Sequence, residues 1–158
     1  MTIIFYFQIV PMTLNPEIQV LVLQYNKIKE IGSASFQFHP ELETVDLSNN
    51  QLIRIQDNTF EAQKKLLKLK LVGNKLNTLT NLSFVGLDSL EYLDISNNKI
   101  DHLPSGLFQS LESLQKLNLV KNEMVKVDGH SFLGLTSLKL LNLNNKSLKN
   151  IPADIFSP

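Results

Sequence analysis

The sequence predicts a curved α/β-type repeat solenoid with a parallel sheet on its concave side and an irregular convex side. Two observations lead to this fold class. A spacing of 24 residues recurs through almost the whole chain, which is the signature of a protein built from stacked structural repeats. Each unit contains a short stretch such as "LDIS", at 93–96, in which apolar residues alternate with variable ones. This alternation is typical of a strand with one buried face.

Six copies of the unit are present, and each reads L-x-x-L-x-L-x-x-N-x-L-x-x-L with a phenylalanine five residues further on. The copies begin at Ile18, Leu42, Leu66, Leu90, Leu114 and Leu138. We therefore divide the chain into an N-terminal strand or cap remnant at 1–17 and six repeats at 18–158. One such unit cannot bury its apolar side alone, whereas stacked copies bury it against each other and align their strands into one parallel sheet.

A phenylalanine column marks the return path of every unit: Phe36, Phe60, Phe84, Phe108, Phe132 and Phe156. Adjacent strands pack about 4.8 Å apart, whereas return segments that enclose a phenyl ring need more room. The stack is therefore expected to curve with its strands on the concave side, and the rings are expected to form a spine inside the convex side.

An asparagine column follows the strands: Asn26, Asn50, Asn74, Asn98 and Asn122. Where the chain leaves a strand and turns inward, backbone groups lose their partners, and an amide side chain offers both donors and an acceptor to satisfy them. We expect these side chains to form a structural ladder between repeats. The sixth copy has Lys146 in this column, and a lysine offers donors only.

This pattern, over residues 18–156, resembles the 24-residue typical class of the leucine-rich repeat family, as in Toll and Toll-like receptor ectodomains, Slit-type guidance proteins and secreted immune leucine-rich proteins of insects. The resemblance implies a horseshoe segment that binds proteins. The stretch "VPMTLNPEIQVLVLQYN", at 10–26, is similar to the junction between an N-terminal cap and the first repeat, except for the inserted Asn15. Because such ectodomains carry cysteine-rich caps and this sequence has no cysteine, we expect a fragment of a longer protein with exposed repeat ends.

Composition narrows the choice of partners. The chain has 15 basic and 15 acidic residues and no net charge, so it predicts no nucleic-acid partner. Its longest apolar run, "IIFYF" at 3–7, is far shorter than the roughly 20 residues of a membrane span. We interpret this run as a first strand, with the remnant of a signal peptide as the alternative.

Nothing in the sequence predicts an enzyme. The stretch "DGHS", Asp128 to Ser131, combines catalytic residue types, but adjacent residues are poorly placed to form a triad, and an exposed convex turn is expected there. His39 and His102 lack partners at metal-ligand spacing and are interpreted as solvated loop residues. No glycine-rich phosphate loop is present, so no cofactor, no metal and no catalytic residue are predicted.

Function is therefore assigned to the variable positions of the strands, which face outward on the concave side. The predicted partner-binding residues are Tyr25, Lys68, Lys70, Val72, Tyr92, Asp94, Lys116, Asn118 and Lys121. Aromatic and charged anchors of this kind dominate protein interfaces. In the alternative interpretation, the charges on neighbouring strands, Asp46, Lys70 and Asp94, only neutralise each other.

Two N-x-S/T sequons, at Asn81 and Asn145, are possible glycosylation sites. The sequence predicts a protein-binding module of a secreted or cell-surface recognition protein of innate immunity or adhesion, whose partner is a protein ligand or co-receptor. Two alternatives stay open. One is an intracellular, cytoplasmic scaffold, and the other is a structural assembly element that forms a homo- or heterodimer through its open C-terminal end.

Overall fold

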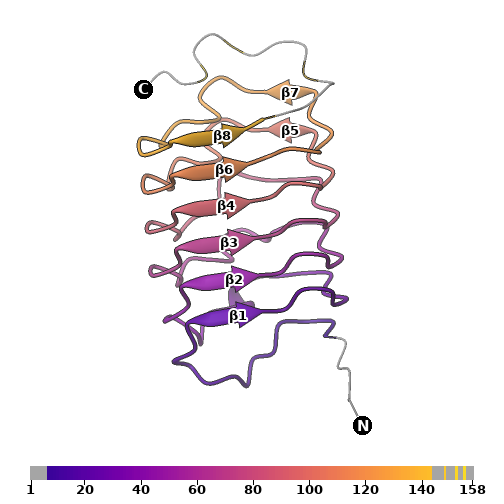
Figure 1. Ribbon diagram of the computed structural model, residues 1–158, viewed down its shortest axis with the longest axis vertical. Coiled ribbons are helices and arrows are strands. Elements are labelled where there is room, and N and C mark those ends of the chain that lie inside the picture. Colours follow the sequence, from indigo (N-terminus) through magenta and orange to yellow (C-terminus); the bar gives the residue numbers. More distant parts are fainter. Residues whose placement is uncertain (1–6, 144–147, 149–151, 153–154, 156–158) are drawn as a thin grey trace.

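The computed structural model describes residues 7–143 together with residues 148, 152 and 155. Six short parallel strands are stacked along the long axis of the molecule, as Figure 1 shows. In their order across the sheet they are β1 (Val20–Val22), β2 (Thr44–Asp46), β3 (Lys68–Lys70), β4 (Tyr92–Asp94), β6 (Lys116–Asn118) and β8 (Leu140–Asn142). The strand order follows the chain, so each repeat adds one strand to the edge made by the repeat before it.

The pairing register follows the repeat length. Val20 pairs with Thr44, and Lys116 pairs with Leu140, at the two ends of the sheet. Every pair in between has the same offset of 24 residues in the numbering. Residues in one column of the sequence therefore become neighbours across the sheet, and the predicted curved solenoid with a parallel concave sheet is confirmed.

The return path of each repeat is irregular. Among the described residues, the structure has one short 3₁₀ helix, η1 (Ser33–Ser35), and no α-helix. A second, two-stranded parallel sheet consists of β5 (His102–Leu103) and β7 (Lys126–Val127), which lie to one side of the main stack in Figure 1. Single bridges, such as Ile31 with Ile55, join earlier repeats in the same region. No helix in the described ranges is long and apolar enough to cross a membrane.

The core lies between the strands and the return segments. The central residue of each strand from β1 to β6 of the main sheet is buried, from Leu21 to Leu117. Phenyl rings stack along the interior of the return side, with centroid distances of 5.3–5.9 Å between consecutive rings of three pairs. The described members of this column are buried: Phe36, Phe60, Phe84, Phe108 and Phe132. Phe156 lies outside the described residues.

The side-chain amides of the asparagine column form hydrogen bonds to the backbones of two successive repeats. The Asn74 Oδ1 accepts a hydrogen bond from the Leu52 amide of the preceding repeat at 3.0 Å. The Asn74 Nδ2 donates to the Leu47 carbonyl of that same repeat at 3.0 Å and to the Leu71 carbonyl of its own strand exit at 3.1 Å. Asn50, Asn98 and Asn122 repeat this pattern. Lys146, in the same column, lies outside the described residues.

The N-terminal segment supplies backbone hydrogen-bond partners to the first repeat, as each repeat does for the one that follows it. The Oδ1 of Asn26, in the first matched strand exit, accepts a hydrogen bond from the Phe7 amide at 2.9 Å. The Phe7 carbonyl accepts from the Lys27 amide at 2.9 Å, which copies a contact made between later repeats. Residues 7–17 form turns and bends without a strand, while Val10 is buried against the core. The strand predicted for residues 3–7 lies outside the described residues apart from Phe7.

His39 corrects an expectation, because it is buried and not a solvated loop residue. Its side chain is 1% exposed, and neither ring nitrogen has a hydrogen-bond partner among the described residues. The same column of later repeats holds the buried Leu87 and Leu111. The alignment of the repeats therefore contained the signal that this position belongs to the core.

Replacing Asn74 by alanine tests the asparagine column. The substitution leaves the Leu52 amide buried without a partner, which costs about 1–3 kcal/mol. It also removes one of the two asparagine donors to the Leu47 and Leu71 carbonyls, which keep Asn50 and Asn98. We expect the free energy of unfolding to fall by about 1–3 kcal/mol in chemical denaturation. The matched control is Asn77→Ala on the exposed surface, which should change stability by less than about 0.5 kcal/mol. Equal effects of the two substitutions would contradict this role.

Candidate functional site

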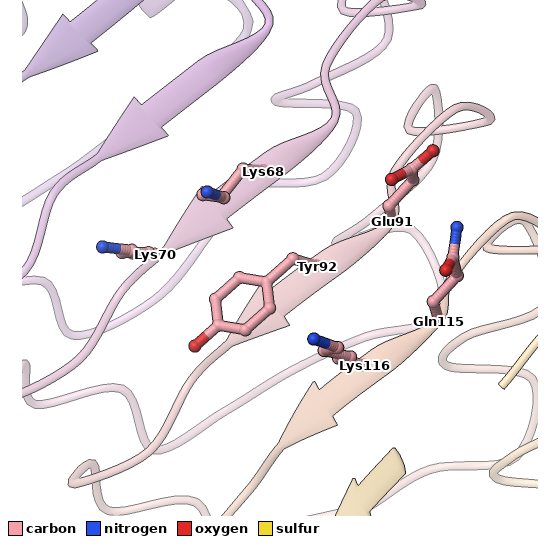
Figure 2. A pocket seen from close by; sticks show the side chains of 6 residues that line it. All are labelled: Lys68, Lys70, Glu91, Tyr92, Gln115 and Lys116. Carbon is pink, nitrogen blue, oxygen red and sulfur yellow. The ribbon is translucent and has the colours of Figure 1, made fainter. Parts of the chain in front are cut away.

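The concave face carries an open depression of about 470 Å³ over the middle of the sheet. Figure 2 shows the ring of Tyr92, on β4, between the lysines of β3 and the lysine of β6. The depression is lined by Lys68, Lys70, Glu91, Tyr92, Gln115 and Lys116. We name this site the Tyr92 pocket. Four of its six residues are among the predicted partner-binding residues.

The strand register places the cationic and aromatic side chains side by side. Lys68 pairs with Tyr92 across β3 and β4, and Tyr92 pairs with Lys116 across β4 and β6. The Lys68 Nζ lies 6.0 Å from the centroid of the Tyr92 ring, at the outer limit of a cation–π contact. Because all three residues occupy the first position of a three-residue strand, they point outward together while the next residue of each strand is buried.

Asp46 is a buried carboxylate next to this site. Its Oδ2 accepts a hydrogen bond from the Gln24 amide at 2.6 Å and lies 3.4 Å from the Lys70 Nζ. Burial by itself raises the pKa of Asp46, but hydrogen bonds from Ser48 and Gln24 and the charge of Lys70 outweigh burial, so the pKa lies below its ordinary value. Asp46 is therefore ionised at neutral pH, and it neutralises Lys70.

Asp94 is bonded differently from the expected ion pair with Lys70. Its Oδ2 accepts hydrogen bonds from the Tyr92 hydroxyl and from the Asn118 amide, both at 3.0 Å, and its Oδ1 accepts from the Ser96 hydroxyl at 2.6 Å. Burial, the charge of Asp94 and the hydrogen bond to Asp94 raise the pKa of Tyr92 to about 12. The phenol thus stays neutral, and its ring is held in place over the sheet. The neutralisation that the sequence suggested applies to Asp46 and Lys70.

The third residue after each of the strands β1, β2, β3, β4 and β6 has a left-handed backbone. The φ angles there are +53° to +67° in Tyr25, Asn49, Gly73, Asn97 and Lys121. Asparagine and glycine tolerate this region, whereas most other residues are strained in it. The asparagines of this column therefore have a backbone role, while Tyr25 and Lys121 hold side chains there at a conformational cost.

The remaining predicted residues are spread along the concave face. Tyr25 is 71% exposed but follows β1, so the structure does not bring it to the Tyr92 pocket. Val72 is half-buried and Lys121 is exposed, and both lie beyond the ends of their strands. Glu91 and Gln115 also line the pocket, but they are not among the predicted residues. Both immediately precede a strand, and the available signal was that every member of their column except Leu67 is polar.

Three ionisable residues of the return segments, His102, Lys126 and Asp128, form a cluster at the surface. The Asp128 Oδ2 lies 2.9 Å from the His102 Nε2, and its Oδ1 lies 2.7 Å from the Lys126 Nζ. The hydrogen bond from Lys126, together with the interactions with His102, outweighs the opposing effect of burial and lowers the pKa of Asp128. The Ser131 hydroxyl is buried and donates to the carbonyls of Leu103 and Asp128, so it is not a nucleophile paired with histidine. No metal-ligating cluster occurs among the described residues.

Replacing Lys121 by asparagine tests the left-handed column. The backbone of Lys121 has a φ of +55°, and asparagine adopts this region at a lower cost than lysine. We expect the free energy of unfolding to rise by about 0.5–1 kcal/mol in chemical denaturation. Lys99→Asn is the matched control, because Lys99 is exposed and is not among the residues with positive φ. A gain that is absent, or equal in the control, would contradict the assignment of strain.

Comparisons with known proteins agree with the geometry. The family model described as "BspA type Leucine rich repeat region" matches residues 25–158 in 6 copies. The crystal structure of a TLR13–ssRNA13 complex matches with a TM-score of 0.67 and 28% identity over 96% of this chain and 25% of that chain. The APL1 leucine-rich repeat domain matches with a TM-score of 0.75 and 25% identity over 84% of this chain and 35% of that chain.

Among curated proteins, no sequence gives a significant match. The chain spans between a quarter and about a third of the two solved structures that it resembles. The six matched copies cover most of the sequence, and the parallel strands keep the register that those copies require. The chain therefore belongs to the leucine-rich repeat family.

Proposed function

We propose that this chain is the protein-binding part of a secreted or cell-surface recognition protein of innate immunity or adhesion. The observation that carries the proposal is the Tyr92 pocket, in which a fixed aromatic ring lies between lysines on an open concave sheet. Tyrosine supplies a large contact area at a low cost in conformational entropy, and such residues dominate the binding energy of protein interfaces. The partner is a protein ligand or co-receptor.

Two strained residues, each three positions beyond the end of a strand, support a binding role for the same face. Tyr25 and Lys121 keep a left-handed backbone where asparagine or glycine would be more stable. Strain of this kind concentrates at functional sites. Tyr25 is exposed together with Val20 and Val22 of β1, so the partner is expected to extend from the Tyr92 pocket toward the first repeat.

One of the similar solved structures is a complex with single-stranded RNA, which makes nucleic acid the contrasting ligand. The present chain has no net charge, and Glu91 lines the pocket together with the lysines. Nucleic-acid binding surfaces are strongly basic instead. These observations favour a protein partner.

Photocrosslinking tests the proposed interface. Benzoylphenylalanine replaces Gln115 in the Tyr92 pocket or, as the control, the exposed Glu61 of a return segment. Each protein is then incubated with extracellular fluid and membranes from its source. We expect a discrete protein adduct from the pocket position alone, and an excess of the unmodified chain should suppress it. Adducts of equal yield from both positions, or none from either, would overturn the proposal.

Localisation is tested at Asn81, which is exposed on a return segment, while Ser83 of the same sequon is buried. A glycan there would stand away from the concave face. We expect the native protein to lose mass on glycosidase treatment, and the secreted Asn81→Gln variant to lack the glycan at this site. Asn145→Gln is the comparison, and Asn145 lies outside the described residues. An unglycosylated native protein would favour the cytoplasmic scaffold, and dimers formed through the C-terminal repeat would favour the assembly element.

A further inference from the structure

We propose that the Tyr92 pocket receives an acidic segment of the protein partner, with one carboxylate bound by Lys68, a second bound by Lys116, and the chain between them lying over the Tyr92 ring. This inference rests on the proposed protein-binding function and specifies the chemistry of the partner. The inference is based on the row of Lys68, Tyr92 and Lys116, which the strand register places side by side on three successive strands.

The charge balance of the pocket favours an anionic partner. Lys70 is neutralised by the buried carboxylate of Asp46, 3.4 Å away. Asp94, the other buried carboxylate of the concave face, is bonded to Tyr92, Ser96 and Asn118. In the described part of the chain, neither Lys68 nor Lys116 forms an ion pair. Two exposed cations thus flank a neutral ring, and the buried carboxylates nearby are already engaged, whereas Glu91 is the exposed carboxylate of the lining.

The spacing of the two lysines fits an extended peptide. Adjacent strands lie about 4.8 Å apart, so the Cα atoms of Lys68 and Lys116, two strands apart, are separated by roughly 10 Å. A peptide in the polyproline II conformation advances about 3.1 Å per residue with three residues per turn. Every third side chain of such a peptide therefore points the same way at an interval of about 9 Å. Acidic residues at every third position match the lysine pair.

The rest of the lining is suited to a peptide backbone. The Gln115 Oε1 accepts a hydrogen bond from the Lys139 Nζ at 3.1 Å, which leaves the Gln115 amide nitrogen as a donor toward a peptide carbonyl. Glu91 offers an acceptor for a peptide N–H. The same carboxylate repels a continuous row of phosphates, whereas a peptide with separated acidic side chains can avoid it. The lining therefore favours an acidic peptide over a nucleic acid.

The test measures the affinity of the whole chain for a fluorescein-labelled 12-residue peptide that repeats Glu-Ser-Gly. Fluorescence anisotropy reports binding, and the same peptide with glutamine in place of glutamate is the control ligand. The pocket variant is the double substitution Lys68→Gln with Lys116→Gln. The matched control is Lys75→Gln with Lys99→Gln, which removes the same charge from exposed sites outside the pocket lining. All four residues are exposed, so unchanged unfolding curves are expected.

We expect the glutamate peptide to bind at least tenfold more tightly than the glutamine peptide. The pocket variant should lose at least tenfold in affinity, and the control variant less than twofold. Equal losses in the two variants, or equal binding of the two peptides, would overturn the inference. Tighter binding of a 12-nucleotide oligouridylate, with the same loss in the pocket variant, would also overturn it and identify a nucleic-acid site.

The photocrosslinking experiment separates this inference from the proposed function. If the adduct at position 115 forms with wild-type affinity in the pocket variant, the concave face binds a protein by other chemistry, and only the acidic-segment inference fails. If no adduct forms and no peptide binds, both fail. An adduct that is suppressed by the glutamate peptide, and not by the glutamine peptide, supports both.

Discussion

The hydrogen bonds of one buried amide side chain per turn hold successive repeats of this solenoid together. Each described asparagine from Asn50 to Asn122 accepts a bond from a backbone amide of the preceding repeat and donates to carbonyls of both repeats. Because these groups are buried at the point where the strand ladder stops, leaving them unpaired would be costly. The amide therefore fixes the distance and register between turns, and the sheet, the stacked phenyl rings and the concave surface all depend on that register.

Because of this register, residues that are 24 positions apart in the sequence lie side by side on the concave surface. Lys68, Tyr92 and Lys116 are far apart in the chain and adjacent in the sheet. Asp46 and Asp94, in the column two positions later, contribute less to the surface because they are buried and hydrogen-bonded. A chain with no net charge thus presents a local group of lysines around an aromatic ring. In a repeat protein, the charge of a surface region therefore depends on which charged residues of each column are exposed to solvent.

The left-handed position beyond each strand shows how backbone and binding requirements compete. Asparagine or glycine at this position satisfies the backbone, as in Asn49, Gly73 and Asn97. The asparagine pairs of the repeat consensus therefore need no ligand to explain them. Tyr25 and Lys121 depart from that preference, and we propose that their side chains belong to the binding surface. Variation at a strained position is thus more informative about function than variation at an unstrained one.

The repeat, the strand positions, the buried columns and the asparagine and phenylalanine columns could all be predicted from the sequence. Period-two alternation and a fixed repeat length dictate which side chains face inward and which residues become neighbours. The partners of polar groups, such as Asp94 with Tyr92 and Asn118 or His102 with Asp128, and the burial of His39 could be learned only from the folded molecule. These contacts depend on side-chain conformations in the stacked turns, which the spacing of residues along the chain does not specify.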